Sequence, residues 1–250
     1  MGFKCGIVGL PNVGKSTIFN AITNAGAESA NYPFCTIEPN VGMVNVPDER
    51  LDKLVEVYTP RSIVPAVTQF VDIAGLVKGA SQGEGLGNQF LTHIRECEAI
   101  MEVVRCFEDE NIVHVHGSVD PLRDVEIIET ELLLKDLDSV EKRLTTETKN
   151  ARTGGAAAKA KLEACEQLKN AMSEGTPARK MLGTSDEMDI LISELALLTA
   201  KPVFYCANVG EDEMLTGNAH VDTLRKYAES NNSAVVVICG KIEEELSTME

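Results

Sequence analysis

The fold of this chain is decided by residues 9–16, which read Gly-Leu-Pro-Asn-Val-Gly-Lys-Ser. This spacing, G-x-x-x-x-G-K-[ST], follows the apolar run Phe3–Val8, which predicts a buried strand, and precedes a helical pattern over residues 16–24. Glycines let backbone N–H groups turn inward around phosphate groups, and the positive end of the following helix points at them. The sequence therefore predicts a phosphate-binding loop (P-loop) between a strand and a helix.

Individual side chains of the P-loop have predictable roles. Lys15 is expected to bridge the β- and γ-phosphates of a nucleotide, and the hydroxyl group of Ser16 is expected to ligate Mg²⁺. The predicted nucleotide-binding residues of this segment are Asn12, Val13, Gly14, Lys15, Ser16 and Thr17.

Two further segments predict contacts to the metal and to the γ-phosphate. Asp72 and Gly75 form the pattern D-x-x-G at the end of an apolar strand pattern over residues 67–73. Asp72 can hold Mg²⁺ through water, while the Gly75 N–H can sense the γ-phosphate and joins Lys15 in the predicted catalytic set. Thr36, in a polar loop between the two motifs, is expected to supply the second hydroxyl ligand of Mg²⁺.

Runs rich in β-branched residues recur along the chain, with helical patterns between many of them. Several of these runs are apolar at both odd and even positions, as in strands that are covered on both faces. We therefore expect an α/β fold with a mainly parallel sheet. The predicted strands are residues 3–8, 41–46, 67–73, 100–107, 202–208 and 234–239.

A long segment without strand signals interrupts this alternation. Apolar residues spaced 4, 3 and 4 apart from Leu133 to Leu144 form one seam, and regularly spaced alanines follow after a break at Gly154-Gly155. The pattern predicts an antiparallel helical (coiled-coil) hairpin. The expected division of the chain is a split nucleotide-binding domain, residues 1–127 and 201–250, and a helical insertion, residues 128–200.

Composition restricts the function further. Of the 250 residues, 44% are apolar and 25% are charged, and no apolar run reaches the length of a membrane span. The seven cysteines form no C-x-x-C pair, and no signal-peptide pattern is present, so we expect reduced thiols and a cytoplasmic location. A net charge of −16 repels anionic membranes and nucleic acids, so neither a membrane nor a specific DNA sequence is expected as a partner.

The tip of the predicted hairpin has the opposite charge. Residues 142–161 contain six cationic side chains and a single anionic side chain, Glu147. Such a bias fits an ordinary solvated helix surface, and it also fits a basic prong that meets an acidic or RNA-rich partner. Both interpretations stay open at this point.

A fourth motif, Asn-Val-Gly-Glu at residues 208–211, follows an apolar strand pattern where nucleotide switches read their base. The four motifs and their order resemble the Obg-like ATPase (YchF) family of Ras-like P-loop proteins, especially over residues 6–20, 31–42 and 70–89. The resemblance covers essentially the whole chain. It implies Mg²⁺-dependent ATP hydrolysis, a nucleotide-gated regulatory role and a ribosome or ribosomal RNA as partner through the hairpin. In that family a TGS-type domain follows the region matched here, and we expect it to be missing from this chain.

The base-reading residues differ from those of GTPases. GTPases use N-K-x-D, in which Asp accepts two hydrogen bonds from guanine, whereas here Val209 replaces the Lys and Glu211 replaces the Asp. The extra methylene displaces the carboxylate by about 1.5 Å, which weakens guanine recognition. The resemblance implies that ATP is preferred over GTP, with Asn208 and the Val209 backbone beside adenine and Gly240 near the base. The alternatives are a conventional GTPase switch and a nucleotide-dependent scaffold whose hydrolysis is incidental.

The group that orients the attacking water also differs. Many GTPases follow D-x-x-G with a Gln, but this chain has Leu76, which cannot form a hydrogen bond to water. We nominate His114 as the catalytic substitute, a role that the resemblance supports; the alternative is a histidine with a structural hydrogen bond. Asn12, in a chain that lacks this Gln, also suggests K⁺ beside the phosphates, as in some relatives.

Overall fold

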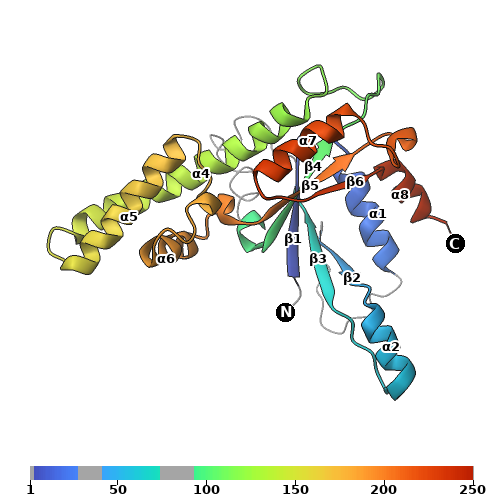
Figure 1. Cartoon of the computed structure of the whole chain (residues 1–250), viewed down its shortest axis with the longest axis horizontal. Coiled ribbons are helices and arrows are strands. Elements are labelled where there is room, and N and C mark those ends of the chain that lie inside the picture. The colour runs from blue at the N-terminus through green and yellow to red at the C-terminus, as the bar shows by residue number, and fades with distance from the viewer. Residues whose placement is uncertain (1–2, 28–40, 74–92, 250) are drawn as a thin grey trace.

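The computed structural model describes residues 3–27, 41–73 and 93–249. Their strands form a six-stranded sheet in the order β2-β3-β1-β4-β5-β6 (Figure 1). Every neighbouring pair is parallel except β2–β3, so the predicted α/β fold with a mainly parallel sheet is confirmed. The strands are β1 (Phe3–Val8), β2 (Val41–Asn45), β3 (Val67–Asp72), β4 (Ala99–Arg105), β5 (Val203–Asn208) and β6 (Val235–Ile238).

Helices cover both faces of this sheet. Helix α1 packs against α8 on one side, and α4 packs against α7 on the other (Figure 1). None of the helices in the described ranges combines the length and the apolar character that a membrane span requires. The helices are α1 (Lys15–Ala27), α2 (Glu49–Tyr58), α4 (Pro121–Asn150), α5 (Ala156–Ser173), α6 (Asp186–Leu195), α7 (Ala219–Ser230) and α8 (Gly240–Leu246), with short 3₁₀ helices η1 (Ala178–Lys180), η2 (Leu198–Ala200) and η3 (Glu211–Glu213).

The central strands place the ends of three motifs side by side. Strand β4 is buried along its whole length, because it has a neighbouring strand on each edge and helices above and below. The register sets Ile7 opposite Asp72, and Arg105 opposite Asn208. Since the carboxyl ends of parallel strands meet at one edge of the sheet, the last residues of β1, β3, β4 and β5 lie together there.

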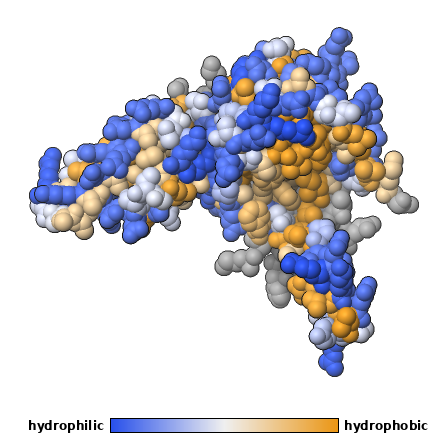
Figure 2. All heavy atoms as spheres, viewed as in Figure 1, coloured by the Kyte–Doolittle hydropathy of each residue, from blue (hydrophilic) through white to orange (hydrophobic). Residues whose placement is uncertain are grey.

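Helix α2 lies outside the main core. None of its residues is buried, and in Figure 2 its projection shows mixed apolar and polar side chains, whereas the surface of the α4–α5 arm is mainly hydrophilic. The helix is held by its own N-cap, in which the Asp48 carboxylate accepts a hydrogen bond from the Arg50 N–H. The exposed apolar residues of this region are Leu54, Val57, Tyr58, Ile63 and Val64.

The predicted helical hairpin is confirmed. Helices α4 and α5 lie side by side and antiparallel (Figure 1), and α5 begins directly after Gly155. The turn is tight at Gly154, where a Cβ atom would lie 2.4 Å from the Ala158 Cβ. The two helices close on a core that includes Val140 from α4 and Ala164 from α5, together with residues of α6. Small alanine side chains allow this close approach.

One uninterrupted helix connects the hairpin to the sheet. Helix α4 has 30 residues and begins with Pro121 after an Asp120 N-cap. Ile128 packs in the core of the sheet, whereas Val140, three turns later, packs in the core of the hairpin. The expected division at residue 128 therefore falls inside a rigid element, because no helix breaker separates the two packing faces.

The base of the hairpin is fixed by a buried carboxylate. Asp136 is fully buried and accepts hydrogen bonds from the backbone N–H of Leu198 at 2.8 Å and of Thr199 at 2.7 Å. The Thr199 hydroxyl group donates a third bond at 2.8 Å. Burial raises the pKa of the Asp136 carboxyl, and the three hydrogen bonds oppose that shift. The side chain thus satisfies the first two N–H groups of η2 and ties that turn to α4.

We predict that Asp136→Ala lowers the free energy of unfolding by about 3 kcal/mol, because it leaves buried backbone donors without partners. Urea unfolding followed by circular dichroism measures the change. Asp138→Ala, two residues away on the exposed face of α4, is the matched control and should change stability by less than about 0.5 kcal/mol. Equal unfolding midpoints for the two variants would contradict this account of the hairpin base.

Candidate nucleotide-binding site

The P-loop adopts backbone angles that require glycine at two positions. Gly9 has φ +150° and Gly14 has φ +96°. A Cβ atom on Gly9 would lie 2.4 Å from the Val103 carbonyl oxygen, and one on Gly14 would lie 2.3 Å from the Asn208 Nδ2. The loop is therefore packed directly against the ends of β4 and β5, as the motif predicts. Asn12 has φ +62°, a left-handed conformation that asparagine tolerates better than most residues.

Lys15 lies across the P-loop, at the start of α1. It is 8% exposed, and its Nζ donates a hydrogen bond to the Leu10 carbonyl oxygen at 2.6 Å. Burial lowers the pKa of Lys15 to about 8, an effect that the negative charge of Asp72 partly offsets. The ammonium group is thus held beside the loop amides, where a phosphate group would be a stronger partner than a single carbonyl oxygen.

Ser16 and Asp72 meet where β1 and β3 end. The Ser16 hydroxyl group donates to Asp72 Oδ2 at 3.2 Å, and Asp72 Oδ1 is buried without a hydrogen-bond partner among the described residues. A buried, unpaired carboxylate oxygen is costly unless a cation or a bound water occupies the adjacent space. The donor set consists of a hydroxyl group and a carboxylate, which are hard oxygen ligands of the kind that Mg²⁺ prefers.

Asn208 connects the P-loop to the last loop of the sheet. Its Nδ2 donates to the Val13 carbonyl oxygen at 2.9 Å, and its Oδ1 accepts from the Gly240 N–H at 2.9 Å. The side chain is 5% exposed, so both polar ends depend on these partners. Asn208 therefore fixes the distance between the phosphate loop and the start of α8.

A cavity of about 490 Å³ lies beside this connection. The Val209 side chain is buried in the hydrophobic core that includes residues of α7. Glu211 is exposed and forms an ion pair with Lys241, in which Lys241 Nζ lies 2.6 Å from Oε1. The predicted residues that line this cavity are Asn12, Gly14, Thr17, Asn208, Val209 and Glu211.

Sequence reasoning missed the residue that shapes one wall of this cavity. Arg105 ends β4, is 1% exposed, and donates to the carbonyl oxygens of Phe107, Ile112 and Asp109 at 3.0, 2.9 and 3.2 Å. Its guanidinium carbon lies 4.6 Å from the centroid of the Phe107 ring. Three backbone contacts from one side chain hold residues 107–112 in a fixed curve. An arginine at the end of a run that is otherwise apolar except for Glu102 was the available signal.

His114 forms hydrogen bonds through both ring nitrogens. Its Nδ1 accepts from the His116 N–H at 3.1 Å, so the proton lies on Nε2, which faces Asp124 Oδ2 at 2.8 Å. The preceding residue, Val113, accepts a bond from Asn12 Nδ2 at 3.1 Å, which places this segment against the P-loop. In this conformation the ring has the structural role, and contact with a water molecule requires it to leave Asp124.

The described parts of the chain therefore bring together the residues predicted at the P-loop, at Asp72 and at the base loop. Gly240 lies against Thr17, since a Cβ atom on the glycine would be 3.5 Å from the Thr17 Cγ2. Thr36 and Gly75, the predicted hydroxyl ligand and γ-phosphate sensor, lie outside the described residues, as does Leu76.

Comparisons with known proteins agree with this geometry. Residues 4–146 match the family described as 50S ribosome-binding GTPase. Over its whole length the chain is 54% identical to the ribosome-binding ATPase YchF of Bacillus subtilis, covering 69% of that protein, and 52% identical to the YchF of Escherichia coli O157:H7, covering 68%. The structure of the Schizosaccharomyces pombe YchF GTPase superposes with a TM-score of 0.85 at 42% identity, covering 100% of this chain and 68% of that one. On sequence, fold and motif geometry together, this chain belongs to the YchF family of P-loop proteins.

Proposed function

We propose that this protein binds and hydrolyses ATP with Mg²⁺, and that the bound nucleotide gates its association with the ribosome. The observation that carries the proposal is the P-loop joined through Asn208 to a base cavity whose Glu211 is paired with Lys241. The relatives from Bacillus subtilis and Escherichia coli are named ribosome-binding ATPases, whereas the Schizosaccharomyces pombe protein is called a GTPase. The choice of base is therefore the point on which the proposal depends.

The cavity favours adenine over guanine for two physical reasons. The Glu211 carboxylate is engaged by Lys241 and projects from an exposed 3₁₀ turn, so it is not held in place to accept two hydrogen bonds from guanine. Val209, at the position where GTPases pack a lysine over the base, is buried in the core. With Glu211 and Val209 unavailable to the base, adenine would contact the Asn208 amide, which is fixed at both ends, and the backbone of residues 209–210.

The phosphate end of the site follows from the P-loop geometry. The residues that would hold Mg²⁺ are Ser16, Asp72 through water and Thr36. Mg²⁺ in such sites neutralises charge that develops on the β- and γ-phosphate oxygens. Lys15 would exchange the Leu10 carbonyl oxygen for phosphate oxygens, and the Gly75 N–H would contact the γ-phosphate. Asn12 is the residue that would face a K⁺ ion, although its Nδ2 is engaged by Val113.

The hairpin tip supports a ribosomal partner for this chain. Arg143 is neutralised, because its guanidinium group pairs with Glu147 and Glu194. The remaining cations of the tip are exposed and form no ion pair within the described residues, so they retain a positive surface on an acidic protein. These cations are Lys142, Lys149, Arg152, Lys159 and Lys161. A ribosomal partner places the protein in the cytoplasm, and the proposal requires neither a membrane nor a specific DNA sequence.

We predict that Glu211→Asp combined with Lys241→Ala shifts nucleotide preference toward GTP by about tenfold. The shorter carboxylate regains the reach used in guanine recognition, and removal of the ammonium group frees it. Competition of unlabelled ATP and GTP against a fluorescent ATP analogue, with Mg²⁺, measures the ratio. Glu245→Asp, an exposed change on α8, is the control. An unchanged ratio in the double variant would reject this explanation of base choice, and a parent that prefers GTP would reject the ATPase proposal.

We also predict that His114→Ala lowers the ATP turnover number at least tenfold, because we propose that the ring leaves Asp124 to orient the attacking water. The affinity for ATP should stay within about twofold, since His114 has no role in binding the ground state. Steady-state phosphate release and equilibrium binding separate the two quantities. His116→Ala, an exposed change two residues away, should leave both unchanged. Full turnover by His114→Ala would assign the ring its structural role alone.

A further inference from the structure

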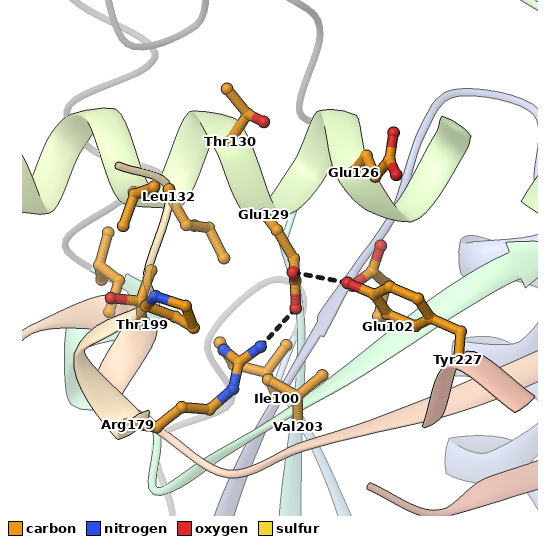
Figure 3. A pocket seen from close by; sticks show the side chains of 14 residues that line it. Ile100, Glu102, Glu126, Glu129, Thr130, Leu132, Arg179, Thr199, Val203 and Tyr227 are labelled. Atoms are coloured by element: carbon orange, nitrogen blue, oxygen red, sulfur yellow. Dashed lines mark hydrogen bonds and ion pairs between the residues drawn. The ribbon is translucent and has the colours of Figure 1, made fainter. Parts of the chain in front are cut away.

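A second cavity lies apart from the nucleotide site. It has a volume of about 310 Å³ and lies between strands β4 and β5, helices α4 and α7, and the segment 175–179 that follows α5 (Figure 3). None of the described residues assigned to nucleotide or metal lines it. This volume is at the lower end of the range for small-molecule sites, about 300–1,000 Å³. The position is the junction between the sheet and the helical hairpin.

A buried carboxyl group without a partner lines this cavity. Glu102 lies in the middle of β4 and is 3% exposed. No residue in the described ranges forms a hydrogen bond or an ion pair with its carboxyl group, although every other residue of the strand except Arg105 is apolar. Burying such a group without compensation costs several kcal/mol, so its retention at the cavity wall points to a ligand.

The other charged groups of the cavity are engaged with one another. Glu129 forms an ion pair with Arg179 and accepts a hydrogen bond from the Tyr227 hydroxyl group at 2.9 Å (Figure 3). Arg179 carries the one guanidinium group among the described lining residues; Glu129 pairs with its terminal nitrogen, while its Nε is buried without a hydrogen-bond partner in the described ranges. Glu126, exposed at the edge of the cavity, adds a third carboxylate. The described lining residues therefore carry three carboxyl groups and one cation, and this excess of carboxyl groups favours a positively charged ligand.

The remaining wall determines what kind of cation fits. Across the described ranges, no cluster of three or more acidic, histidine or cysteine side chains is arranged to hold a metal ion. Much of the lining is aliphatic, which favours a ligand with a hydrocarbon part. The aliphatic residues are Ile100, Leu132, Leu133, Pro177, Leu198 and Val203.

We propose that this cavity binds a small organic cation, a primary ammonium or guanidinium group on a short aliphatic stem, with Glu102 as its buried counter-ion. The cationic group would lie between Glu102 and Glu129, and the stem would lie along the aliphatic wall. The inference is independent of the proposed ATP hydrolysis. It adds a second ligand site at the base of the hairpin, where η1 and α4 meet the sheet.

Binding of such a cation should release a proton. Burial raises the pKa of the Glu102 carboxyl well above its ordinary value, and the charges of Glu129 and Asp124 raise it further, against Arg179, which lowers it. Tyr205 of β5 and Tyr227 of α7 also face this region and have raised pKa values, so they stay neutral. The raised pKa favours the protonated form of Glu102 in the empty cavity. A bound cation ionises it, the proton passes to solvent, and affinity rises with pH.

The test uses n-butylamine as the probe and 1-pentanol, an uncharged alcohol with one more methylene, as the comparison, in isothermal titration calorimetry on the nucleotide-free protein. We expect n-butylamine to bind with release of about one proton, measured in two buffers of different ionisation enthalpy. We expect 1-pentanol to bind at least tenfold more weakly. Glu102→Gln, which keeps the neutral shape of the protonated acid and should fold, is expected to weaken amine binding at least tenfold.

Two further variants complete the design. Glu229→Gln makes the same change of charge on the exposed face of α7 and should leave amine binding unaltered. Val203→Phe fills the cavity without removing a carboxyl group and should abolish binding. Equal affinity for 1-pentanol, full affinity in Glu102→Gln, or no binding of n-butylamine at millimolar concentrations would each overturn the proposal. Since ATP turnover is not the readout, these failures would leave the proposed function untouched.

Discussion

The nucleotide site depends on one buried amide, the side chain of Asn208. Its donor satisfies the Val13 carbonyl oxygen in the P-loop, and its acceptor satisfies the Gly240 N–H at the start of α8. The amide approaches the loop so closely that only glycine fits at position 14. This planar amide has one donor end and one acceptor end. It thereby fixes the positions of both the P-loop and the wall of the base cavity. The requirement for asparagine follows from this paired geometry, since aspartate lacks the donor and glutamine is longer.

Helix α4 connects the region of the nucleotide site to the hairpin. At its first turn Asp124 holds His114, near its middle Asp136 holds η2, and its last turns form one side of the basic tip. Thirty residues of α-helix span about 45 Å. A change at the loop beside the P-loop and a partner at the hairpin tip would therefore act on the same rigid element. This connection is the physical basis on which we infer that nucleotide gates partner binding.

Much of the site could be predicted because its motifs are local in sequence and constrained by phosphate chemistry. The P-loop, the meeting of Ser16 with Asp72 and the base-loop position of Asn208 follow from motifs that sit at the carboxyl ends of strands. The seams of α4 and α5 predicted the hairpin, since alanine spacing and the Gly154-Gly155 break are visible without tertiary information. The continuity of α4 through residue 128 could not be predicted, because one helix changes packing partners without any change in its own pattern.

The features that sequence reasoning missed depend on contacts that form only in the folded chain. Arg105 and Glu102 read as interruptions of an apolar run, and only the fold shows that one organises a loop and the other lines a cavity. The pairing of Glu211 with Lys241 joins η3 to the first turn of α8, thirty residues away in the sequence. The bond between His114 and Asp124 likewise requires the turn before α4 to be known. Polar residues at the ends or centres of buried strands are thus the positions where tertiary structure adds most.

The measurement that tests the central role of Asn208 most directly is equilibrium binding of fluorescent ATP and GTP analogues to Asn208→Ala, with thermal unfolding recorded on the same samples. If this amide fixes the phosphate loop and the base wall together, affinity for both nucleotides falls at least tenfold and in the same proportion, because buried partners on both sides are left unpaired. The folded state should persist at the temperature of the binding assay. A folded variant that retains full affinity, or that loses affinity for only one of the two nucleotides, would contradict the account.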